Sequence, residues 1–427
     1  MKILMLLFGR REEGTYYRAF PWARHLAAGG HAVTLMCVSP ARRFIPLEEQ
    51  ADGVRIIETP NLGDGRGLLR KLSGLAGWGP LDLAARVREI RRGGYDLVHT
   101  FEHHCNVALP VYLAGRRGAP VLVADWCDHY GPGGFRQNGK RPRLEPVYTR
   151  LGLPLRAGAD SMERRLRLRA DGVTVISRYL EERALALGVP ESNIRRIPGS
   201  AEIGAIHPLP KAEARAKLGV DPRQHVAAFF GAAQFDVDIA LDAFARVAAS
   251  DPQALLLLMG APDHAVERHI TERGLTRRVR RTGWVAEPLL PAWLACADVF
   301  LLPMRDTPVN RARWPNKIGF YMAAARPTVC SDVGDVAGVV RGEGIGLVVR
   351  GGAGAFAEGI LQLFLDPGAA AGMGRRAREV AEQKFDIAVQ GRALEDAYRS
   401  FTARASACGR VGATSCDGGT VGSPCRP

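Results

Sequence analysis

The sequence predicts an α/β protein built from two doubly wound, Rossmann-like domains that face each other across a cleft. Short, continuous apolar runs alternate with segments of helical periodicity, in one series from 3–8 to 173–176 and in a second from 226–230 to 346–349. Apolar strands separated by helices are typical of parallel sheets covered on both faces. A stretch rich in Pro and Gly, 197–210, separates the two series, and 427 residues are too many for one ordinary core.

Each series contains enough apolar runs for a sheet of its own. In the first series, strands are expected at 3–8, 32–38, 54–59, 96–101, 120–124 and 173–176. In the second series, strands are expected at 226–230, 254–259, 279–284, 299–302, 328–330 and 346–349. Helical periodicity fills the intervals, most clearly at 18–28, 83–91 and 177–187. Ligands of doubly wound sheets bind beyond the carboxyl ends of the strands, so two such domains would enclose a ligand between those ends.

The charge of the chain favours an anionic partner. There are 58 Lys and Arg against 44 Asp and Glu, a formal net charge of +14. The excess lies in the first half, where 136–170 holds ten cations against three carboxylates and 61–95 holds seven against three. A membrane surface, a phosphorylated substrate or nucleic acid would suit such a field. No nucleic-acid module is recognisable, so nucleic acid is not expected as a partner.

One segment of the first half has the composition of a membrane-surface helix. Residues 67–92 mix leucines, Trp78 and arginines, as interfacial segments do, and their positive charge suits anionic headgroups. A surface helix packed on its own domain is the alternative. The sequence therefore leaves open a peripheral contact with the inner face of a membrane.

The cysteines and the first residues indicate a cytoplasmic protein without a metal centre. None of the eight cysteines forms a C-x-x-C pair, which argues against zinc and thioredoxin-like sites, and free cysteines suit a reducing compartment. His103 and His104 adjoin Glu102 but lack a nearby third ligand. No apolar run approaches the ~18 residues of a membrane span. The opening MKILMLLFGR is typical of a first strand and not of a signal peptide.

The stretch 298–336 contains the clearest candidate binding site. A buried strand is followed by a loop with four cations, then by Pro315 at an expected helix start, and then by a second strand. Helix N-termini and arginine forks bind phosphate groups well. The four cations are Arg305, Arg311, Arg313 and Lys317. A βαβ unit with a solvated basic loop is the alternative, but a lysine in a first helical turn is electrostatically unfavourable without an anion.

Polar residues also follow strands of the first series. Gly14 and Thr15 occupy the first strand-to-helix turn, where a glycine lets the backbone approach a ligand closely, although a simple tight turn explains them equally well. Asp125, Asp128 and His129 lie in the loop DWCDHYGPGG and are candidates for a base, an orienting group or an acceptor ligand. Since Asp and Gly are common in turns, a local structural role is the alternative.

The order of several motifs resembles that of a known family. They are Gly14-Thr15, Arg18, Gly30 to Thr34, Asp96 to Thr100, Ala170 to Leu180, Leu187 to Pro190, Ile194 to Glu202, Phe230-Gly231, Leu258 to Gly260, Gly283-Trp284, Ala297-Asp298 and Pro315 to Pro327. Each motif is weak, but the whole set in this order is specific. Over roughly residues 1–400 the chain resembles a GT-B glycosyltransferase of the retaining group 1 class, family 4 of the glycosyltransferases.

The resemblance implies an organisation and a reaction. Residues 1–198 would bind the acceptor, 199–384 would bind a nucleotide-sugar, and a helix at 385–403 would cross back onto the first domain. By composition, 404–427 is expected to be disordered. The reaction would transfer a sugar with retention of configuration and without a metal or cofactor. The expected donor-binding residues are Gly14, Thr15, Gly231, Arg305, Asn310, Arg311, Arg313, Asn316, Lys317 and Phe320, and the expected catalytic residues are Asp128 and His129.

The chain departs from the family pattern at several positions. Two glutamates usually stand eight residues apart around the donor helix, where this chain has Ala312 and Phe320, and the usual glycine at the helix end is Ala325. An Arg and a Lys usually follow the second domain's first strand, but 231–238 contains neither. A histidine of the first domain is replaced by Trp126. Either the phosphate-binding cations have moved to the loop at 305–317, or the protein is a weakened or inactive member of the fold.

These observations leave four functions to compare. The first is a retaining glycosyltransferase of cell envelope polysaccharide or glycolipid synthesis, with an unknown, lipid-linked acceptor suggested by the basic first domain. The second is an epimerase or phosphorylase of the same fold, for which no residue demands a cofactor. The third is a non-catalytic protein that binds nucleotide-sugars or serves as a scaffold. The fourth, nucleic-acid binding, has only the positive charge in its favour.

Overall fold

The computed structural model describes residues 1–62, 79–115, 120–130, 134, 161–231 and 236–407. The expected interfacial segment 67–92 and the basic stretch 136–170 lie partly outside these residues. The expected tail, 404–427, lies outside them from residue 408 onward. None of the described helices is long and apolar enough to cross a membrane.

The first sheet has eight strands in the order β3-β4-β2-β1-β5-β6-β7-β8, which are parallel except for β3. The strands are β1 (Lys2–Arg10), β2 (Ala32–Val38), β3 (Leu47–Ala51), β4 (Val54–Thr59), β5 (Leu97–Phe101), β6 (Val121–Trp126), β7 (Gly172–Val175) and β8 (Ile194–Arg196). Its described helices are α1 (Tyr16–Ala28), α3 (Pro80–Gly93), α4 (Cys105–Ala114) and α7 (Arg178–Ala186), together with a helical stretch at 161–169 that carries Arg167. The central strands are continuous apolar runs because helices cover both of their faces.

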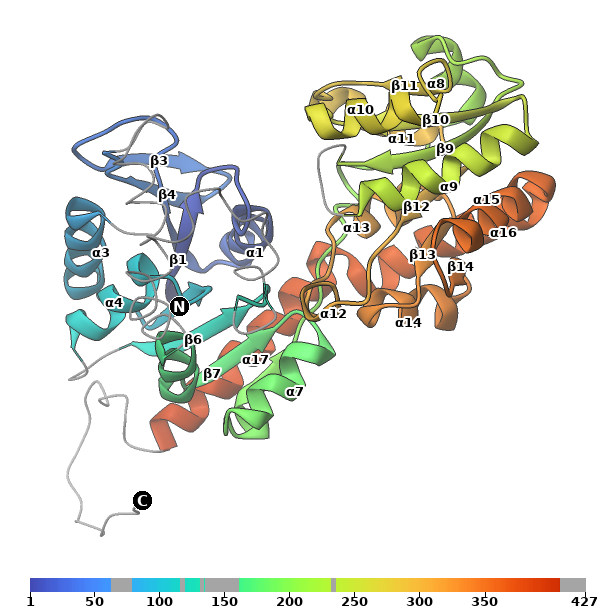
Figure 1. Ribbon diagram of the computed structural model, residues 1–427. Helices are drawn as coiled ribbons and strands as arrows, with labels where there is room; N and C mark the ends of the chain where they lie inside the picture. Colours follow the sequence, from blue (N-terminus) through green and yellow to red (C-terminus); the bar gives the residue numbers. More distant parts are fainter. Residues whose placement is uncertain (63–78, 116–119, 131–133, 135–160, 232–235, 408–427) are drawn as a thin grey trace, which may run out of the picture.

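The second sheet has six parallel strands in the order β11-β10-β9-β12-β13-β14. The strands are β9 (His225–Phe230), β10 (Ala254–Met259), β11 (Val279–Arg281), β12 (Val299–Leu302), β13 (Thr328–Ser331) and β14 (Gly346–Val349). The helices around them are α8 (Lys211–Leu218), α9 (Val237–Ser250), α10 (His264–Glu272), α11 (Leu290–Ala295), α12 (Pro308–Ala312), α13 (Lys317–Ala323), α14 (Gly334–Glu343), α15 (Ala353–Leu365) and α16 (Pro367–Val380). The predicted class, two doubly wound parallel-sheet domains, is confirmed (Figure 1).

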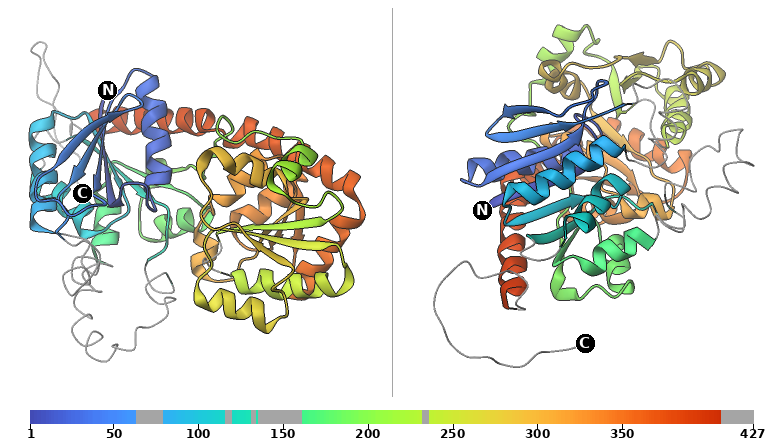
Figure 2. Two further views of the ribbon diagram at one scale, coloured as in Figure 1. Left: turned by 90° about the horizontal axis from the view of Figure 1, so that it is seen from above. Right: turned by 90° about the vertical axis from the view of Figure 1, so that its left-hand side faces the viewer.

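The last helix, α17 (Ile387–Ala407), leaves the second domain and packs against the first (Figures 1 and 2). Its Tyr398 and Phe401 are buried in one apolar cluster with α1 and the first sheet. The Tyr398 hydroxyl lies 2.7 Å from Nδ1 of His99 on β5. A Cβ added to Gly172 would lie 2.2 Å from the Phe401 ring, so a glycine is required where this helix meets β7. The first strand and the last described helix are thereby joined in one core.

Two short strands and one helix boundary differ from the sequence-based expectation. Strand β3 reads LEEQA and lies at the exposed edge of the sheet, so it carries no apolar run. Strand β8 has three residues, of which only Ile194 is buried. The helix expected to start at Pro315 is α13, which begins at Lys317, and the loop before it contains an additional short helix, α12, which begins at Pro308 and ends where Arg313 adopts φ −90° and ψ 156°.

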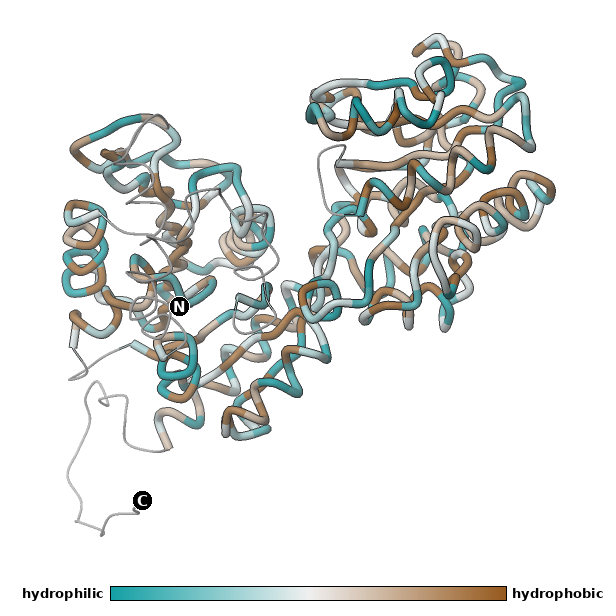
Figure 3. Tube along the Cα trace, in the orientation of Figure 1, coloured by the Kyte–Doolittle hydropathy of each residue, from teal (hydrophilic) through white to brown (hydrophobic). Residues whose placement is uncertain are grey.

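The hydropathy of the chain follows this layering. Figure 3 shows apolar strands inside each domain and mixed polar and apolar helices outside them. A large apolar cluster extends across both domains and includes Trp126 and Val173 of the first together with Trp314 and Tyr321 of the second. The two domains are therefore joined by buried apolar contacts as well as by the linker.

The carboxyl edges of the two sheets meet where α7 approaches α12 and α14. Ser177, directly after β7, donates its hydroxyl to the carbonyl oxygen of Ala312, 2.6 Å away. The backbone N–H of Arg178 donates to Oδ2 of Asp335 on α14, at 2.8 Å. A Cβ on Gly199 of the linker would lie 2.4 Å from the Trp314 ring. Residues that follow strands of the first sheet therefore lie near residues that follow strands of the second.

Ala325 is strained, and glycine there should stabilise the protein. Ala325 follows α13 with φ +57°, and α16 packs so closely that a Cβ on Gly374 would lie 2.3 Å from the Ala325 carbonyl oxygen. We expect Ala325→Gly to raise the free energy of unfolding by ~1 kcal/mol, since the left-handed conformation costs L-residues about 1–2 kcal/mol. Ala403→Gly, at an exposed position of α17, should instead lower it by ~0.5–1 kcal/mol. Denaturant titration of both variants tests this; equal losses would contradict it.

Candidate active site between the two sheets

Glu102 is the most tightly held carboxyl at the carboxyl edge of the first sheet. It follows β5 with φ +69°, a left-handed conformation that is unusual for a glutamate, and it is 0% exposed. Its Oε1 accepts the backbone N–H groups of Cys127 and Asp128, each at 2.9 Å, and the thiol of Cys127 at 3.0 Å. The end of β5 therefore fixes the loop that follows β6.

The backbone of Asp128 is held in this loop by hydrogen bonds, whereas its carboxyl takes no part in them. The buried Trp126 donates its indole N–H to the Asp128 carbonyl oxygen at 3.0 Å, and Arg167 stacks 3.8 Å from the indole centroid. Within the described part of the chain, the Asp128 carboxyl makes no hydrogen bond and no ion pair. Trp126, which stands where the family usually has a histidine, therefore holds this loop through its indole N–H.

The surroundings of Asp128 favour its neutral form. Burial, together with the nearby charge of Glu102, raises the pKa of Asp128 to about 8, while Arg313 of the second domain opposes the shift. Arg313 therefore acts on Asp128 across the boundary between the domains. This electrostatic contact brings one expected catalytic residue and one expected donor-binding residue into the same site.

His129 and Asp125 are placed deeper than Asp128. His129 is 0% exposed and its ring centroid lies 5.9 Å from that of Tyr179 on α7. Asp125 accepts two bonds from Arg18, both at 3.0 Å, and one from the Thr174 hydroxyl at 2.6 Å. Asp125 is thus part of a buried ion pair, and of the three candidates in this loop Asp128 is the one that remains available to a ligand.

Lys317 and Arg313 form the cationic side of the site. Nζ of Lys317 lies 4.1 Å from the ring centroid of Phe229 on β9, and no carboxylate of the described residues lies within ion-pairing distance of it. Burial, with a smaller contribution from Arg313, lowers the pKa of Lys317 to about 7. Burial also lowers the pKa of Arg313. Two desolvated cations beside each other favour an anion between them.

The other two cations of the loop are engaged by carboxylates. Arg305 binds Asp236, with Nη1 2.5 Å from Oδ1, and also binds Asp238 on α9. Arg311 is exposed and pairs with Asp306, with Nε 2.5 Å from Oδ1. The structure therefore separates Arg305 and Arg311, which carboxylates neutralise, from Lys317, which has no carboxylate within ion-pairing distance among the described residues.

Asn310 belongs to the neutralised part of the loop. It is 4% exposed and donates through Nδ2 to Oδ2 of Asp236 and to the carbonyl oxygen of Arg305, both at 2.8 Å. Asp236 itself adopts a left-handed conformation, with φ +64°, before α9. Asn310 thus positions Asp236, and it contacts the predicted anion site only through that residue.

The remaining expected donor-binding residues lie at the same strand edges. Gly14, with φ +54°, is exposed, and Thr15 is buried with a hydroxyl that has no hydrogen-bond partner among the described residues. Gly231 follows β9 with φ +96°, and Asn316 is exposed before α13. Phe320 is partly buried, and its ring packs edge-on against Phe230 with 5.5 Å between centroids. Phe320 therefore packs against the end of β9 and offers no hydrogen bond.

Glu102, Cys127 and Asp128 place one potential metal-ligand atom each within 4.8 Å of one another. Oε1 of Glu102 is already occupied by three donors. Burial raises the pKa of the Cys127 thiol well above its ordinary value, so the sulfur keeps its proton. We therefore treat the set as a hydrogen-bonded carboxyl and thiol cluster and assign no metal to it.

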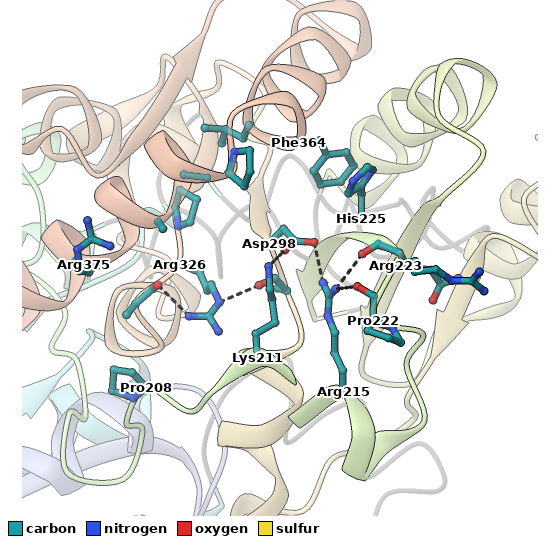
Figure 4. Close-up of a pocket in the computed structure, with 18 residues that line it drawn as sticks. Pro208, Lys211, Arg215, Pro222, Arg223, His225, Asp298, Arg326, Phe364 and Arg375 are labelled. Atoms are coloured by element: carbon teal, nitrogen blue, oxygen red, sulfur yellow. Dashed lines mark hydrogen bonds and ion pairs between the residues drawn. The ribbon is translucent and has the colours of Figure 1, made fainter. Parts of the chain in front are cut away.

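A pocket of about 540 Å³ lies at the opposite, amino edge of the second sheet (Figure 4). Three of its cations have structural partners: Arg215 donates to the Cys296 carbonyl oxygen at 2.9 Å and to Asp298 at 2.7 Å, and Lys211 pairs with Asp298 at 2.5 Å. Arg326 donates to the carbonyl oxygens of residues 295 and 297. These groups cap the end of α11, and the pocket lies away from the strand ends that bind ligands in such folds.

The fold and the site together define a class of protein. Two Rossmann-like domains that meet at their carboxyl edges, with a last helix returning to the first, are the GT-B arrangement. Residues 14–199 match the family described as glycosyl transferase 4-like domain, and 224–366 match glycosyl transferases group 1. The two ranges cover about three quarters of the 427 residues, and the chain belongs to the group 1 glycosyltransferases of the GT-B fold.

Individual relatives are distant. A GDP-mannose-dependent alpha-(1-6)-phosphatidylinositol monomannoside mannosyltransferase of Mycobacterium tuberculosis is 28% identical over 240 residues, which are 53% of this chain and 62% of that protein. The match thus spans less than two thirds of that relative. A D-inositol 3-phosphate glycosyltransferase of Segniliparus rotundus is 34% identical over 120 residues, or 25% of this chain and 26% of that one.

Solved structures share the fold over nearly the whole chain. A sucrose-phosphate synthase from Thermosynechococcus elongatus has a TM-score of 0.74 at 21% identity, covering 95% of this chain and 100% of that one. HepE from Anabaena, in complex with UDP, has a TM-score of 0.64 at 19% identity, covering 94% and 100%. At these identities the likeness establishes the GT-B fold and nothing finer.

Three residues of this site were not singled out from the sequence. Glu102 was considered only as a neighbour of two histidines, although its place at a strand end was a usable signal. Asp236 occupies the stretch in which the family's cations are missing, and its pairing with Arg305 is visible only in the fold. Trp284 follows β11 and is 86% exposed, which is unusual for a tryptophan.

The depressed pKa of Lys317 predicts that binding of a nucleoside diphosphate weakens as pH rises. Above pH 7 the free protein holds Lys317 mostly neutral, so an anion that needs the charged form must bind together with a proton. We expect proton uptake at pH 8, measured by titration calorimetry in two buffers of different ionisation enthalpy. Lys317→Gln should abolish the uptake, whereas Lys217→Gln, at an exposed position of α8, should retain it. Uptake that is equal in all three proteins would contradict the assignment.

The depressed pKa of Lys317 also predicts how the stability of the ligand-free protein depends on pH. Because the folded pKa of Lys317, about 7, lies below the ordinary value of 10.5, the unfolded chain binds more protons between these values. The contribution of Lys317 to the free energy of unfolding therefore rises with pH across this window. Denaturant titrations of the wild type and Lys317→Gln at pH 6.5 and pH 9.5 measure their free energies of unfolding. The value of the variant minus that of the wild type should be larger at pH 6.5 than at pH 9.5.

Proposed function

We propose that the protein transfers a glycosyl group from a nucleotide-sugar, bound by the second domain, to an acceptor bound by the first, with retention of configuration. The observation that supports this most directly is the pair Lys317 and Arg313, two desolvated cations at the carboxyl edge of the second sheet, of which Arg313 acts on Asp128 across the domain boundary. Retention rests on the resemblance to the family alone.

The chemistry follows from the charge that develops when the sugar leaves its nucleotide. The bond that breaks joins the anomeric carbon to the β-phosphate oxygen, so negative charge grows on the diphosphate. Lys317 and Arg313 would stabilise that charge in surroundings where solvent screens little. Trp284, at the end of β11, offers an exposed face on which a nucleotide base could stack. Asp128 would face the sugar or the acceptor from the other domain.

A nucleotide-sugar-binding protein without catalysis is the second candidate. Ala312 is 0% exposed and its carbonyl oxygen accepts the Ser177 hydroxyl, so a backbone contact between domains occupies the place of a family glutamate. Phe320 cannot accept a hydrogen bond from a ribose. These two features favour binding without transfer, and an assay for both binding and transfer separates the candidates.

Nucleotide binding is the first test. We expect GDP or UDP, or one of their sugars, to raise the melting temperature of the protein, since a ligand at a hundred times Kd stabilises by about 2.7 kcal/mol. Lys317→Gln and Arg313→Gln should each weaken binding by roughly tenfold to a hundredfold, because a charge-assisted bond contributes about 1.5–3 kcal/mol. Lys217→Gln is the control. Unchanged affinity in both site variants would show that the diphosphate binds elsewhere.

Transfer is the second test. Incubation with the nucleotide-sugar that stabilises best and with glycolipid acceptors should release a nucleoside diphosphate in proportion to the glycosylated product. Tight binding with no release for any acceptor would favour the non-catalytic candidate.

A lipid-linked acceptor is the class we propose, supported by an exposed apolar tip at the carboxyl edge of the first sheet. Phe44 and Ile45, between β2 and β3, are 61% and 71% exposed, and Leu62 after β4 is 37% exposed. Arg42 and Arg43 adjoin them, and the Arg42 guanidinium lies 5.4 Å from the Phe44 ring centroid. Apolar side chains beside cations suit a bilayer with anionic headgroups. The named substrate of the mycobacterial relative is itself a phosphatidylinositol derivative.

Vesicle sedimentation tests the membrane contact. We expect the protein to pellet with anionic vesicles at low salt and less with neutral ones, and the double variant Phe44→Ser, Ile45→Ser to bind at least tenfold more weakly, since each side chain loses ~1.5–3 kcal/mol of burial. Leu365→Ser, which removes a leucine that is 85% exposed on the second domain, is the matched control. Equal pelleting of the double variant and the control would remove this surface from the proposal.

A further inference from the structure

Two carboxyl groups lie close together at the carboxyl edge of the first sheet, with oxygens within 4.8 Å of each other. Glu102 comes from the end of β5 and Asp128 from the loop after β6. Two carboxylates at such a separation repel each other strongly where solvent screens little, so one of them tends to keep a proton. The contacts of each group decide which one does.

Burial raises the pKa of Glu102, but the groups that contact it favour its ionised form. Its Oε1 accepts two backbone N–H groups and one thiol, and hydrogen bonds donated to a carboxylate favour its charged form. Nη2 of the buried Arg167 lies 3.9 Å from Oε2, and Nδ1 of His103 lies 3.5 Å from it. The backbone and thiol donors reach Glu102 from the loop after β6, and Arg167 reaches it from the helical stretch at 161–169.

Asp128 has the contacts of the protonated member. Among the described residues its carboxyl makes no hydrogen bond and no ion pair. The charged groups that act on it are Glu102 and Asp125, which favour the neutral form, and Arg313 and Arg18, which oppose it. Arg18 is already bound to Asp125 by two bonds of 3.0 Å, which leaves Arg313 as the main opposing charge.

We propose that Glu102 and Asp128 form a carboxyl pair in which Glu102 is the ionised positioning residue and Asp128 holds the proton, so that Asp128 meets its ligand as a hydrogen-bond donor. Glu102 acts in two ways: it fixes the Asp128 backbone through a 2.9 Å bond, and its charge keeps the neighbouring carboxyl neutral. The partner of the Asp128 O–H is an uncharged oxygen of a carbohydrate, either a hydroxyl or a ring oxygen. This role for Asp128 rests on the proposed function, whereas the protonation pattern does not.

Direct titration tests the protonation pattern without any substrate. The carboxyl carbon of Asp128 is observed by NMR in protein labelled with carbon-13 aspartate, and its signal is assigned by its loss in Asp128→Asn. We expect a midpoint near 8, and in Glu102→Gln a midpoint that moves down toward the ordinary aspartate range. Glu58→Gln, which neutralises a carboxyl 7% exposed on β4, should leave the midpoint unchanged. If Asp128 of the wild type titrates in the ordinary aspartate range, the proposed carboxyl pair is wrong. This outcome does not depend on whether Glu102→Gln folds.

The role of the proton is tested by replacing Asp128 with a permanent donor. If Asp128 donates to its ligand, Asp128→Asn should keep kcat/KM within about tenfold of the wild type at pH 6.5 and should lose the decline that the wild type shows above pH 8. The constant compared is kcat/KM for the acceptor at a saturating concentration of the nucleotide-sugar. Under this condition the titration of Lys317, which both proteins contain, does not contribute to the difference between them. If Asp128 instead acts as a base, Asp128→Asn loses activity at every pH, and the proposal falls.

The two tests distinguish this proposal from the proposed function. If no nucleotide-sugar is transferred but the NMR midpoint behaves as expected, the carboxyl pair stands and the glycosyltransferase assignment fails. If transfer is observed while Asp128 titrates as an ordinary aspartate, the function stands and the pair is wrong.

Discussion

The buried ion pair between Arg18 and Asp125 is the interaction on which the site depends. Arg18 binds Asp125 with two bonds of 3.0 Å and also donates to the Ile197 carbonyl oxygen at 3.0 Å, while Thr174 completes the set from β7. It therefore joins α1, the end of β6, β7 and the start of the interdomain linker. Loss of one partner would leave a buried charge uncompensated, which is far costlier than loss of a surface pair. The loop with Asp128 begins one residue beyond β6, so its position follows from this pair.

The two domains contribute opposite electrostatic halves to one site. The first domain brings carboxyl groups held by backbone donors, Glu102 above all, and the second brings Lys317 and Arg313. Each half is unfavourable by itself, because burial disfavours the charged form of both kinds of group. The contact of Ser177 with Ala312 brings the two halves together. The charge of Arg313 then lowers the pKa of Asp128 across the domain boundary. A ligand with an anionic end and a neutral, hydroxyl-rich end would match both.

The departures from the family pattern become intelligible in three dimensions. In the stretch after β9 where the family usually has cations, this chain has Asp236, which is bound by Arg305 and Asn310. Ala312 serves the domain contact through its carbonyl oxygen, and Phe320 packs on Phe230. The strain at Ala325 remains because α16 packs closely over that turn. Of the four cations in the loop, Arg305 and Arg311 are therefore already engaged by carboxylates.

The sequence by itself determined the two parallel sheets and the loops that carry polar residues, because continuous apolar runs and helical periodicity are local properties of the chain. It identified Lys317 and Asp128 for the same reason, since each follows a recognisable strand. Strands β3 and β8 escaped it because they carry no apolar pattern. The tertiary structure alone decided which charges are paired: Arg305 is neutralised by aspartates, Asp125 is bound by Arg18, and Glu102 faces Asp128. Those pairings join residues of different strands and helices, and electrostatic energy depends on their distance in space and not on their separation along the chain.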